Sequence, residues 1–149
     1  MLKLNIGAGN FPMEGEGWKN HDLTKHRPEI DIAFNLNEFP YPLKSNKYDF
    51  IRMHDVMEHL DNTIAVMNEL WRILKPNCEL ELKVCGMNNP NRYKDVTHMG
   101  RFFDVGSFDL FDESTERGKE LSYYTDKKWC IVSERLYREN IFLKLMPIK

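Results

Sequence analysis

The sequence MLKLNIGAGN, residues 1–10, decides the fold that we predict for this chain. Leu2, Leu4 and Ile6 alternate with Lys3 and Asn5, which is the period of a half-buried strand with one apolar and one polar face. Gly-Ala-Gly follows at once. The stretch therefore predicts a first strand that runs directly into a tight turn.

The glycine turn suggests a site for a nucleotide-type cofactor. Because glycine has no Cβ, a ligand can approach the bare backbone of such a turn. Asp22 lies fifteen residues beyond Gly7, and an acidic residue at the end of the next strand can accept hydrogen bonds from a ribose diol. A GxG turn alone is weak evidence, and Pro12 stands where a dinucleotide fingerprint has its third glycine.

Composition and charge are those of an ordinary globular chain. The 149 residues suit one domain, which we expect to span 1–149, and the net charge of −2 argues against a general affinity for nucleic acid. Cys78, Cys85 and Cys130 form no CxxC pair, which favours a reducing compartment over disulfides or structural zinc. No apolar run is long enough to cross a bilayer, and Met1 leads into a strand rather than a signal peptide. We therefore expect a cytoplasmic protein without a membrane partner.

The remaining pattern predicts an α/β, Rossmann-like fold, with a mostly parallel sheet and an antiparallel C-terminal strand. Further strands are expected at residues 18–22, 31–36, 48–54 and 79–84, and a closing hairpin at 123–138 and 140–148. A helix with one apolar stripe should run from a cap at Asp61 or Asn62 to about Leu74, and Pro76 should end it.

One face of this sheet should carry few helices. Only residues 7–17 connect the first two strands, which leaves room for a helix of two turns at most, and the connection 23–30 is equally short. The first and fifth strands alternate apolar and polar residues, whereas fully covered parallel strands are continuously apolar. We expect helices to be thin or missing on one face, which is then solvated or covered by a second copy in a homo-oligomer.

Six segments, in order along the chain, carry a resemblance to a known family. The chain resembles the class I S-adenosylmethionine-dependent methyltransferases, in particular the small methyltransferase-11-like branch with a LEH motif and a C-terminal hairpin. The matching segments are LNIGAGN (4–10), HDL (21–23), FNLNEFPYP (34–42), YDFIRMHDVMEHL (48–60), ELWRILKP (69–76) and DVTHMGRFF (95–103). The order of these segments is more specific than any one of them.

The resemblance implies S-adenosylmethionine as the cofactor and assigns residues to it. Gly7, Ala8 and Gly9 would pack under its methionine half, with Asn10 close by. Asp22 would bind the ribose hydroxyls.

Four more residues are assigned by the same resemblance. Asn35 and Leu36 would flank the adenine, and the Asn35 oxygen could accept a hydrogen bond from the exocyclic amine. His54 and Asp55 would border the methyl-transfer pocket. The family usually has a longer helix after the glycine turn, so part of the cofactor's cradle should be missing here.

Asp95 and His98, in the motif DVTH, are the candidate catalytic residues. Methyl transfer needs mainly positioning and exclusion of water, and a base only where the acceptor carries a proton at neutral pH. His98 could relay such a proton because histidine titrates near neutrality, and Asp95 could orient it. Alternatively, His98 fastens the loop by donating to a backbone carbonyl.

A metal site is the less favoured interpretation of the residues near the fourth strand. Asp55 and His59 are four residues apart, so a helix would place both on one face. No third ligand is visible in the sequence, and we predict no metal. Glu58 and His59 are instead expected to anchor the start of the helix.

Two functions stay open from the sequence. The first is S-adenosylmethionine-dependent methyl transfer to an unidentified acceptor, either a small molecule or a group on a macromolecule. The second is a non-catalytic protein of the same fold that binds or regulates a partner. Cofactor affinity separates the two.

Overall fold

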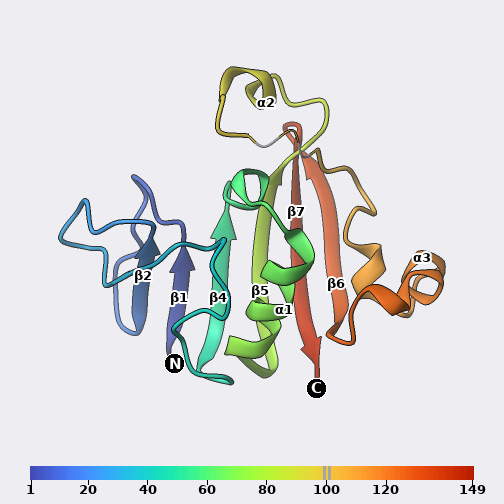
Figure 1. Cartoon of the computed structure of the whole chain (residues 1–149), viewed down its shortest axis with the longest axis horizontal. Coiled ribbons are helices and arrows are strands. Elements are labelled where there is room, and N and C mark those ends of the chain that lie inside the picture. Colours follow the sequence, from blue (N-terminus) through green and yellow to red (C-terminus); the bar gives the residue numbers. More distant parts are fainter. Residues whose placement is uncertain (99, 101) are drawn as a thin grey trace.

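The computed structural model describes residues 1–98, 100 and 102–149, which contain one seven-stranded sheet of order β3-β2-β1-β4-β5-β7-β6 (Figure 1). The strands are β1 (Lys3–Ile6), β2 (Trp18–Asp22), β3 (Ile32–Ala33), β4 (Tyr48–His54), β5 (Leu74–Cys85), β6 (Lys128–Tyr137) and β7 (Asn140–Ile148). The first five pair in parallel, and β7 is antiparallel to β5 and β6. The predicted mostly parallel sheet with an antiparallel C-terminal strand is confirmed.

The helices are few and mostly short. They are α1 (Thr63–Ile73), α2 (Asn91–Lys94), α3 (Glu116–Glu120) and the 3-10 turns η1 (Met57–His59), η2 (Asp109–Phe111) and η3 (Ser122–Tyr124). In Figure 1, α1 lies in front of β4 and β5, whereas α2 lies beyond the edge at which the parallel strands end. Within the described part of the chain, no helix has the length and apolar character needed to cross a membrane.

Helix α1 begins and ends where local chemistry dictates. The Asn62 side chain caps its start by accepting from the Ala65 N–H at 3.0 Å. The helix ends at Ile73, and Leu74 already has extended backbone and pairs with β4. The predicted helix end at about Leu74 is therefore confirmed to within one residue, and Pro76 lies in the strand that follows.

The hydrophobic core lies on the α1 face of the sheet. Successive strands pair Leu4 with Ile51, Ile51 with Leu80 and Leu80 with Leu145 at one level, so the four side chains share one face. All four are fully buried. Buried residues of α1 pack against this cluster, among them Leu70.

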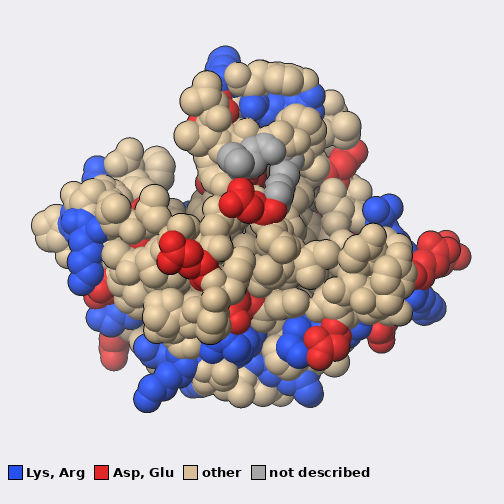
Figure 2. Space-filling view, viewed as in Figure 1, with Lys and Arg blue, Asp and Glu red and all other residues tan. Residues whose placement is uncertain are grey.

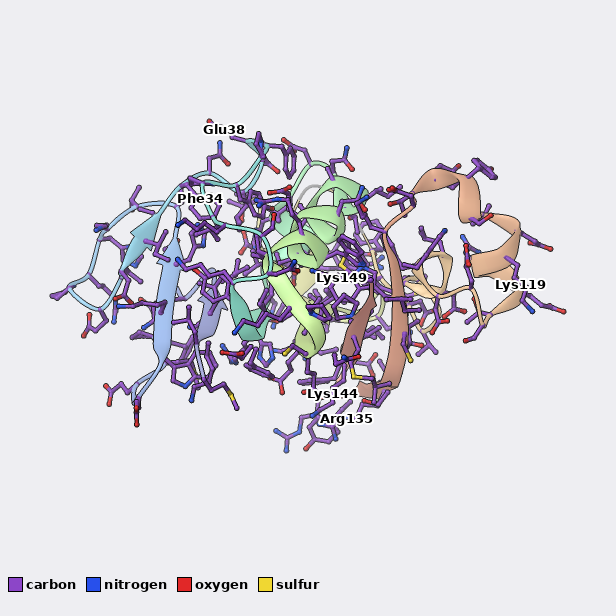
Figure 3. The ribbon with its side chains drawn as sticks, turned by 90° about the horizontal axis from the view of Figure 1, so that it is seen from below. Phe34, Glu38, Lys119, Arg135, Lys144 and Lys149 are labelled. Atoms are coloured by element: carbon purple, nitrogen blue, oxygen red, sulfur yellow. The ribbon has the colours of Figure 1, made fainter. Side chains whose placement is uncertain are left out.

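The opposite face carries a row of polar residues at the neighbouring register level. Asn5 is opposite Arg52, Arg52 is opposite Glu81, and Glu81 is opposite Lys144. Figure 3 shows Lys144 and Arg135 projecting away from the side of the sheet that holds α1. The expectation that helices are thin or missing on one face is confirmed for the described residues.

Residues 7–17, all of which the structure describes, contain no helix, which is within the predicted limit of two turns. Instead, the Asn20 amide accepts from the Met13 N–H at 2.8 Å, donates to the Met13 carbonyl at 3.0 Å, and also accepts from Asn5. Although Asn5 lies on the polar side of β1, this network and the loop above it bury the residue completely. Side-chain amides here take the place of helix packing.

The third strand is shorter than predicted. Residues 31–36 were expected, but only Ile32–Ala33 pair with β2. The pairing of β3 with β2 stops at Ala33, because the next carbonyl, that of Phe34, lies 3.0 Å from the side-chain Nε2 of His21 instead of pairing with a backbone N–H. The fifth strand is longer than the predicted 79–84, and the closing hairpin forms as β6 and β7.

Candidate functional site

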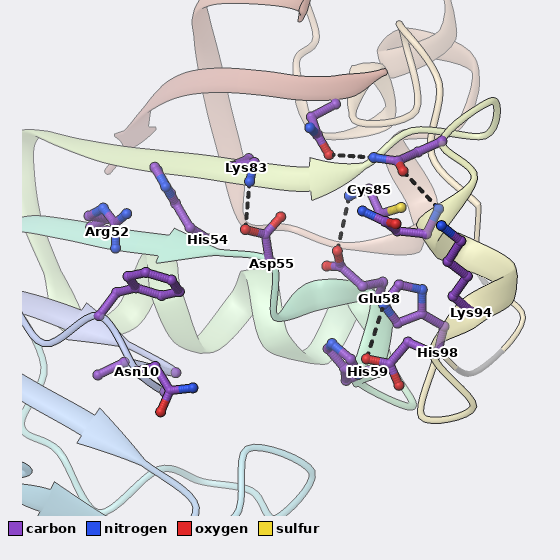
Figure 4. A pocket seen from close by; sticks show the side chains of 18 of the residues that line it. Asn10, Arg52, His54, Asp55, Glu58, His59, Lys83, Cys85, Lys94 and His98 are labelled. Carbon is purple, nitrogen blue, oxygen red and sulfur yellow. Dashed lines mark hydrogen bonds and ion pairs between the residues drawn. The ribbon is translucent and has the colours of Figure 1, made fainter. Parts of the chain in front are cut away.

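Two adjoining cavities lie at the edge of the sheet where β1, β4 and β5 end. The larger, about 860 Å³, extends from the glycine turn to α2, and Figure 4 shows its lining. The smaller, about 330 Å³, lies between the glycine turn and the segment after β3. In Figure 2, a notch separates the part of the molecule at β1 and β2 from the part at α2. Four residues line both cavities, namely Gly7, Gly9, Asp55 and His59.

The glycine turn is held in a conformation that favours glycine. Gly7 and Gly9 have φ of +65° and +52°, the left-handed region. A Cβ on Gly7 would lie 2.2 Å from a methyl group of Val56, whereas among the described residues none beyond Gly9 and its chain neighbours has an atom within 4 Å of a Cβ position on Gly9. Gly7 therefore packs against the start of the η1 segment, and Gly9 leaves its side of the turn open to a ligand.

Residues at the end of β2 fix this turn in place. The Asp22 carboxylate accepts from the Gly9 N–H at 2.6 Å and from the Leu23 N–H at 2.7 Å. His21 is buried, with Nδ1 3.4 Å from the Gly7 N–H and Nε2 beside the Phe34 carbonyl. Because Nδ1 accepts a hydrogen bond and Nε2 donates one, the ring is neutral in this arrangement. Burial lowers the pKa of His21, while the Phe34 carbonyl and the Asp22 charge act in the opposite direction.

The other residues assigned to the adenosine half line the smaller cavity. Asn35 and Leu36 lie there beside Asp22. The Asn35 oxygen accepts from the Asn37 N–H at 3.0 Å, and a carbonyl oxygen has a second lone pair for another donor. Asn10 lines the larger cavity, and its side-chain oxygen accepts from Arg27 at 2.8 Å.

His54 is the last residue of β4, Asp55 follows it, and the two side chains have different partners. The His54 ring lies 2.7 Å from Glu81 Oε1, and burial together with Arg52 lowers its pKa. Asp55 has φ of +55° and is paired with Lys83 at 2.6 Å. The helical spacing considered for Asp55 and His59 does not form, because the helix begins only at Thr63.

A buried carboxyl group lies between the cavity and β5. Glu58 is 1% exposed, and its Oε1 accepts from the Cys85 N–H at 3.0 Å. Its Oε2 has no hydrogen-bond partner among the described residues, and burial raises the pKa of this carboxyl. The bond from Cys85 fixes η1 to β5, which agrees with the anchoring role expected of Glu58.

Asp95 and His98 both line the larger cavity, together with His59. His98 Nε2 is 3.9 Å from Asp95 Oδ2, too far for a hydrogen bond. Asp95 accepts instead from the Thr97 hydroxyl at 2.6 Å, which lowers the pKa of Asp95, and that hydroxyl is 2.8 Å from His59 Nδ1. The segment DVTHMGRFF also contains Met99 and Arg101, which lie outside the described residues.

The structure thus gathers every predicted site residue around two cavities, although the role of each stays a prediction. The larger cavity takes Gly7, Ala8, Gly9, Asn10, His54, Asp55, Asp95 and His98, and the smaller adds Asp22, Asn35 and Leu36. Sequence reasoning missed the buried His21 contact with the turn. It also missed that residues 95–98 lie beside His59 in the folded chain. No local sequence pattern signals this contact.

The site fits S-adenosylmethionine. Gly9 leaves open space where a Cβ would lie, so the turn presents bare backbone to a ligand. The Asp22 carboxylate offers about four lone-pair sites, of which the two backbone N–H groups occupy only some. Both cavity volumes are in the range of small-molecule sites.

Comparison with known proteins agrees with this site. Residues 20–82 match the family described as "Methyltransferase domain". None of the curated proteins matches the sequence. The match runs from within β2 to within β5 and so includes Asp22, Asn35 and His59.

Solved structures share the fold at low sequence identity. An S-adenosylmethionine-dependent methyltransferase from Mesorhizobium loti aligns with a TM-score of 0.65 and 8% identity, over 97% of this chain and 90% of that one. A methyltransferase of the same kind from Aquifex aeolicus aligns with a TM-score of 0.61 and 17% sequence identity, over 99% of this chain and 82% of that one. A Haloferax volcanii methyltransferase in complex with the activator Trm112 aligns with a TM-score of 0.64 and 11% sequence identity, over 97% of this chain and 81% of that one.

The chain has the fold of the class I S-adenosylmethionine-dependent methyltransferases, as the resemblance predicted. The family match and these neighbours support a methyltransferase enzyme. S-adenosylmethionine is the cofactor that the family and the fold imply.

Proposed function

We propose that this protein transfers the methyl group of S-adenosylmethionine to a small molecule, or to a group on a macromolecule, held in the larger cavity. The observation that carries the proposal is the junction of the two cavities at Gly7, Gly9, Asp55 and His59. The bound cofactor supplies an electrophilic methyl group on a sulfonium. A ligand that lies across the junction has one half in each cavity, as the two halves of this cofactor require.

The residues of the smaller cavity are proposed to bind the adenosine half. Asp22 accepts from the ribose hydroxyls while it holds the Gly9 N–H, so the same carboxylate fixes both turn and ligand. Asn35 and Leu36 flank the adenine. The backbone of the glycine turn lies under the methionine half, and Asn10 orders the end of that turn through Arg27.

The acceptor is proposed to enter from the side of α2. Asp95 and His98 line that part of the larger cavity and are the predicted catalytic residues. His98 projects from a loop and is largely buried, with 9% of its side chain exposed. Exclusion of water from the reacting atoms favours methyl transfer, and the loop that contains α2 supplies it here.

Calorimetry tests the cofactor assignment. We expect S-adenosylhomocysteine to bind with one site per chain, and Asp22→Ala to weaken binding at least tenfold. Asp126→Ala is the matched control, because Asp126 is exposed and its carboxylate pairs with the neighbouring Lys127. Absence of binding by both S-adenosylmethionine and S-adenosylhomocysteine at high protein concentration would leave the non-catalytic alternative. Unchanged affinity in Asp22→Ala would refute the ribose role.

Two further proposals concern the setting of the protein. A homo-oligomer through the thinly covered sheet face is supported by the alternating charges of Arg52, Glu81 and Lys144 across that face. A cytoplasmic location is supported by three free cysteines, since unpaired thiols suit a reducing compartment.

A further inference from the structure

We propose that His59, Asp95 and His98 form a binding site for a divalent cation, with zinc as the best chemical match. One ligand atom from each residue lies within 4.8 Å of the others. The His59 and His98 rings are 4.7 Å apart between centroids and nearly perpendicular, at 73°. Figure 4 shows both rings on the same side of the larger cavity.

The donor set has the composition of a catalytic zinc site. Two imidazoles and one carboxylate are ligands that zinc accepts, at about 2.0–2.2 Å. Ligand atoms around a tetrahedral zinc ion are then roughly 3.4 Å apart. The three atoms therefore need to approach one another by up to about 1.4 Å. Rotation of the Asp95 side chain can supply this movement, because that side chain is half-exposed.

Thr97 gives the cluster the support that metal ligands usually have. Its hydroxyl donates to Asp95 Oδ1 at 2.6 Å and can accept from Nδ1 of His59 at 2.8 Å. A histidine that binds a metal commonly donates its other ring N–H to such a partner, which fixes its tautomer. Here that bond leaves Nε2 of His59 as the ligand atom.

The location of the cluster implies what the cation would do. All three residues line the larger cavity, and His59 also borders the smaller one. Three protein ligands leave a fourth position open, and the adjoining space is where the acceptor is proposed to bind. The cation would hold an acceptor of the hydroxyl or thiol class through its oxygen or sulfur, and favour loss of that group's proton to water.

This use of the cation rests on the proposed methyl transfer, but its binding can be tested without cofactor. Untagged protein is freed of metal with a chelator, dialysed, and titrated with Co²⁺ by visible absorption and with Zn²⁺ by calorimetry. We expect one site per chain, with cobalt d–d absorption that zinc abolishes. Absence of a thiolate charge-transfer band separates this site from the cysteines.

Variants locate the site. His59→Ala, His98→Ala and Asp95→Asn should each weaken binding more than 100-fold, and Thr97→Val, which keeps all three ligands, about tenfold. His26→Ala is the control, because His26 is exposed and its ring contacts the Thr24 carbonyl. Circular dichroism checks that each variant is folded. If either alanine variant unfolds, the metal affinities of Asp95→Asn and Thr97→Val, at exposed positions, test the site instead.

The two proposals fail in different ways. Failure of the wild type to bind one equivalent of Co²⁺ or Zn²⁺, or equal affinity in His59→Ala, would overturn the metal site. Binding of S-adenosylhomocysteine by the metal-free protein would in that case still support methyl transfer. Conversely, stoichiometric metal binding without any S-adenosylhomocysteine binding would support the metal site and refute the proposed use.

Discussion

At the scale of single residues, the site depends on a few side chains that serve the fold and the ligand together. Gly7, His21 and Asp22 form one contact group in which two side chains bind the backbone of the glycine turn. The glycine motif and the acidic residue were visible in the sequence. The histidine contact was not, because it depends on β1 and β2 being adjacent in the sheet.

Gly7→Ala should destabilise the protein more than Gly9→Ala. Both positions have positive φ, which costs an alanine about 1–2 kcal/mol. Only at Gly7 does the new Cβ meet Val56, at 2.2 Å, and such overpacking adds about 1–3 kcal/mol. Urea unfolding of both variants measures the difference. Equal losses of unfolding free energy would show that Val56 moves aside without cost.

His21 should make the protein less stable in mild acid. Its pKa is lowered in the folded state, so the unfolded chain takes up a proton first as the pH falls below 6.5. Its contribution is therefore present above pH 6.5 and lost as the pH drops toward the folded pKa. Urea unfolding at about pH 7.5 and pH 5.5 should give a smaller pH effect in His21→Gln than in the wild type. An identical pH effect in both proteins would contradict the buried neutral ring.

At the scale of elements, strands 18–22 and 48–54 were predicted with their observed bounds. Alternation of apolar and polar residues and the turn residues that flank a strand are local signals, so they predict strand bounds without knowledge of the tertiary structure. The third strand was predicted too long, because the Phe34 carbonyl just after β3 lies beside the His21 ring. At the end of α1, Leu74 already pairs with Tyr48 of β4 as the first residue of β5. Both outcomes depend on neighbours distant in sequence.

The cap of α1 offers a test of local helix chemistry. Asn62→Ala removes the acceptor for the Ala65 N–H and should lower the unfolding free energy by about 1 kcal/mol. Asn62→Asp keeps a carboxylate acceptor at this exposed position and should retain most of the stability. Thermal unfolding compares the two. An equal loss in both variants would argue against the cap.

The amide network under residues 10–17 should be costly to remove. Asn20→Ala loses three hydrogen bonds, to the Met13 N–H, the Met13 carbonyl and the Asn5 amide. Unsatisfied buried groups cost about 1–3 kcal/mol each, so we expect a loss of about 3 kcal/mol in urea unfolding. A loss below about 1 kcal/mol would show that the loop is not held by this network.

At the scale of the whole molecule, the arrangement of helices divides the sheet into two unlike faces. The α1 face holds the core, and the other holds the row of Arg52, Glu81 and Lys144. In Figure 2, basic side chains gather along the lower part of the α1 face, away from the end with the notch. The alternation of β5 predicted two unlike faces, whereas the gathering of residues 95–98 around His59 needed the folded chain.

The polar face gives a prediction about assembly. If a second copy covers it, Lys144→Glu should lower the dimer fraction in sedimentation velocity, because the row would then lose its alternation of charge and present only acidic residues at this end to the second copy. Lys119→Glu, on α3 and away from this face in Figure 3, is the matched control. A monomer at all concentrations, or a dimer unaffected by Lys144→Glu, would contradict the proposed interface.

Amide NMR spectra recorded with S-adenosylhomocysteine test the central claim, that the cofactor lies across the two cavities, most directly. The account predicts shift changes concentrated at residues 7–10, 22–23 and 35–37, with the far ends of β6 and β7 unchanged. Changes confined to the polar face of β5 and β7, or none at saturating ligand, would contradict it.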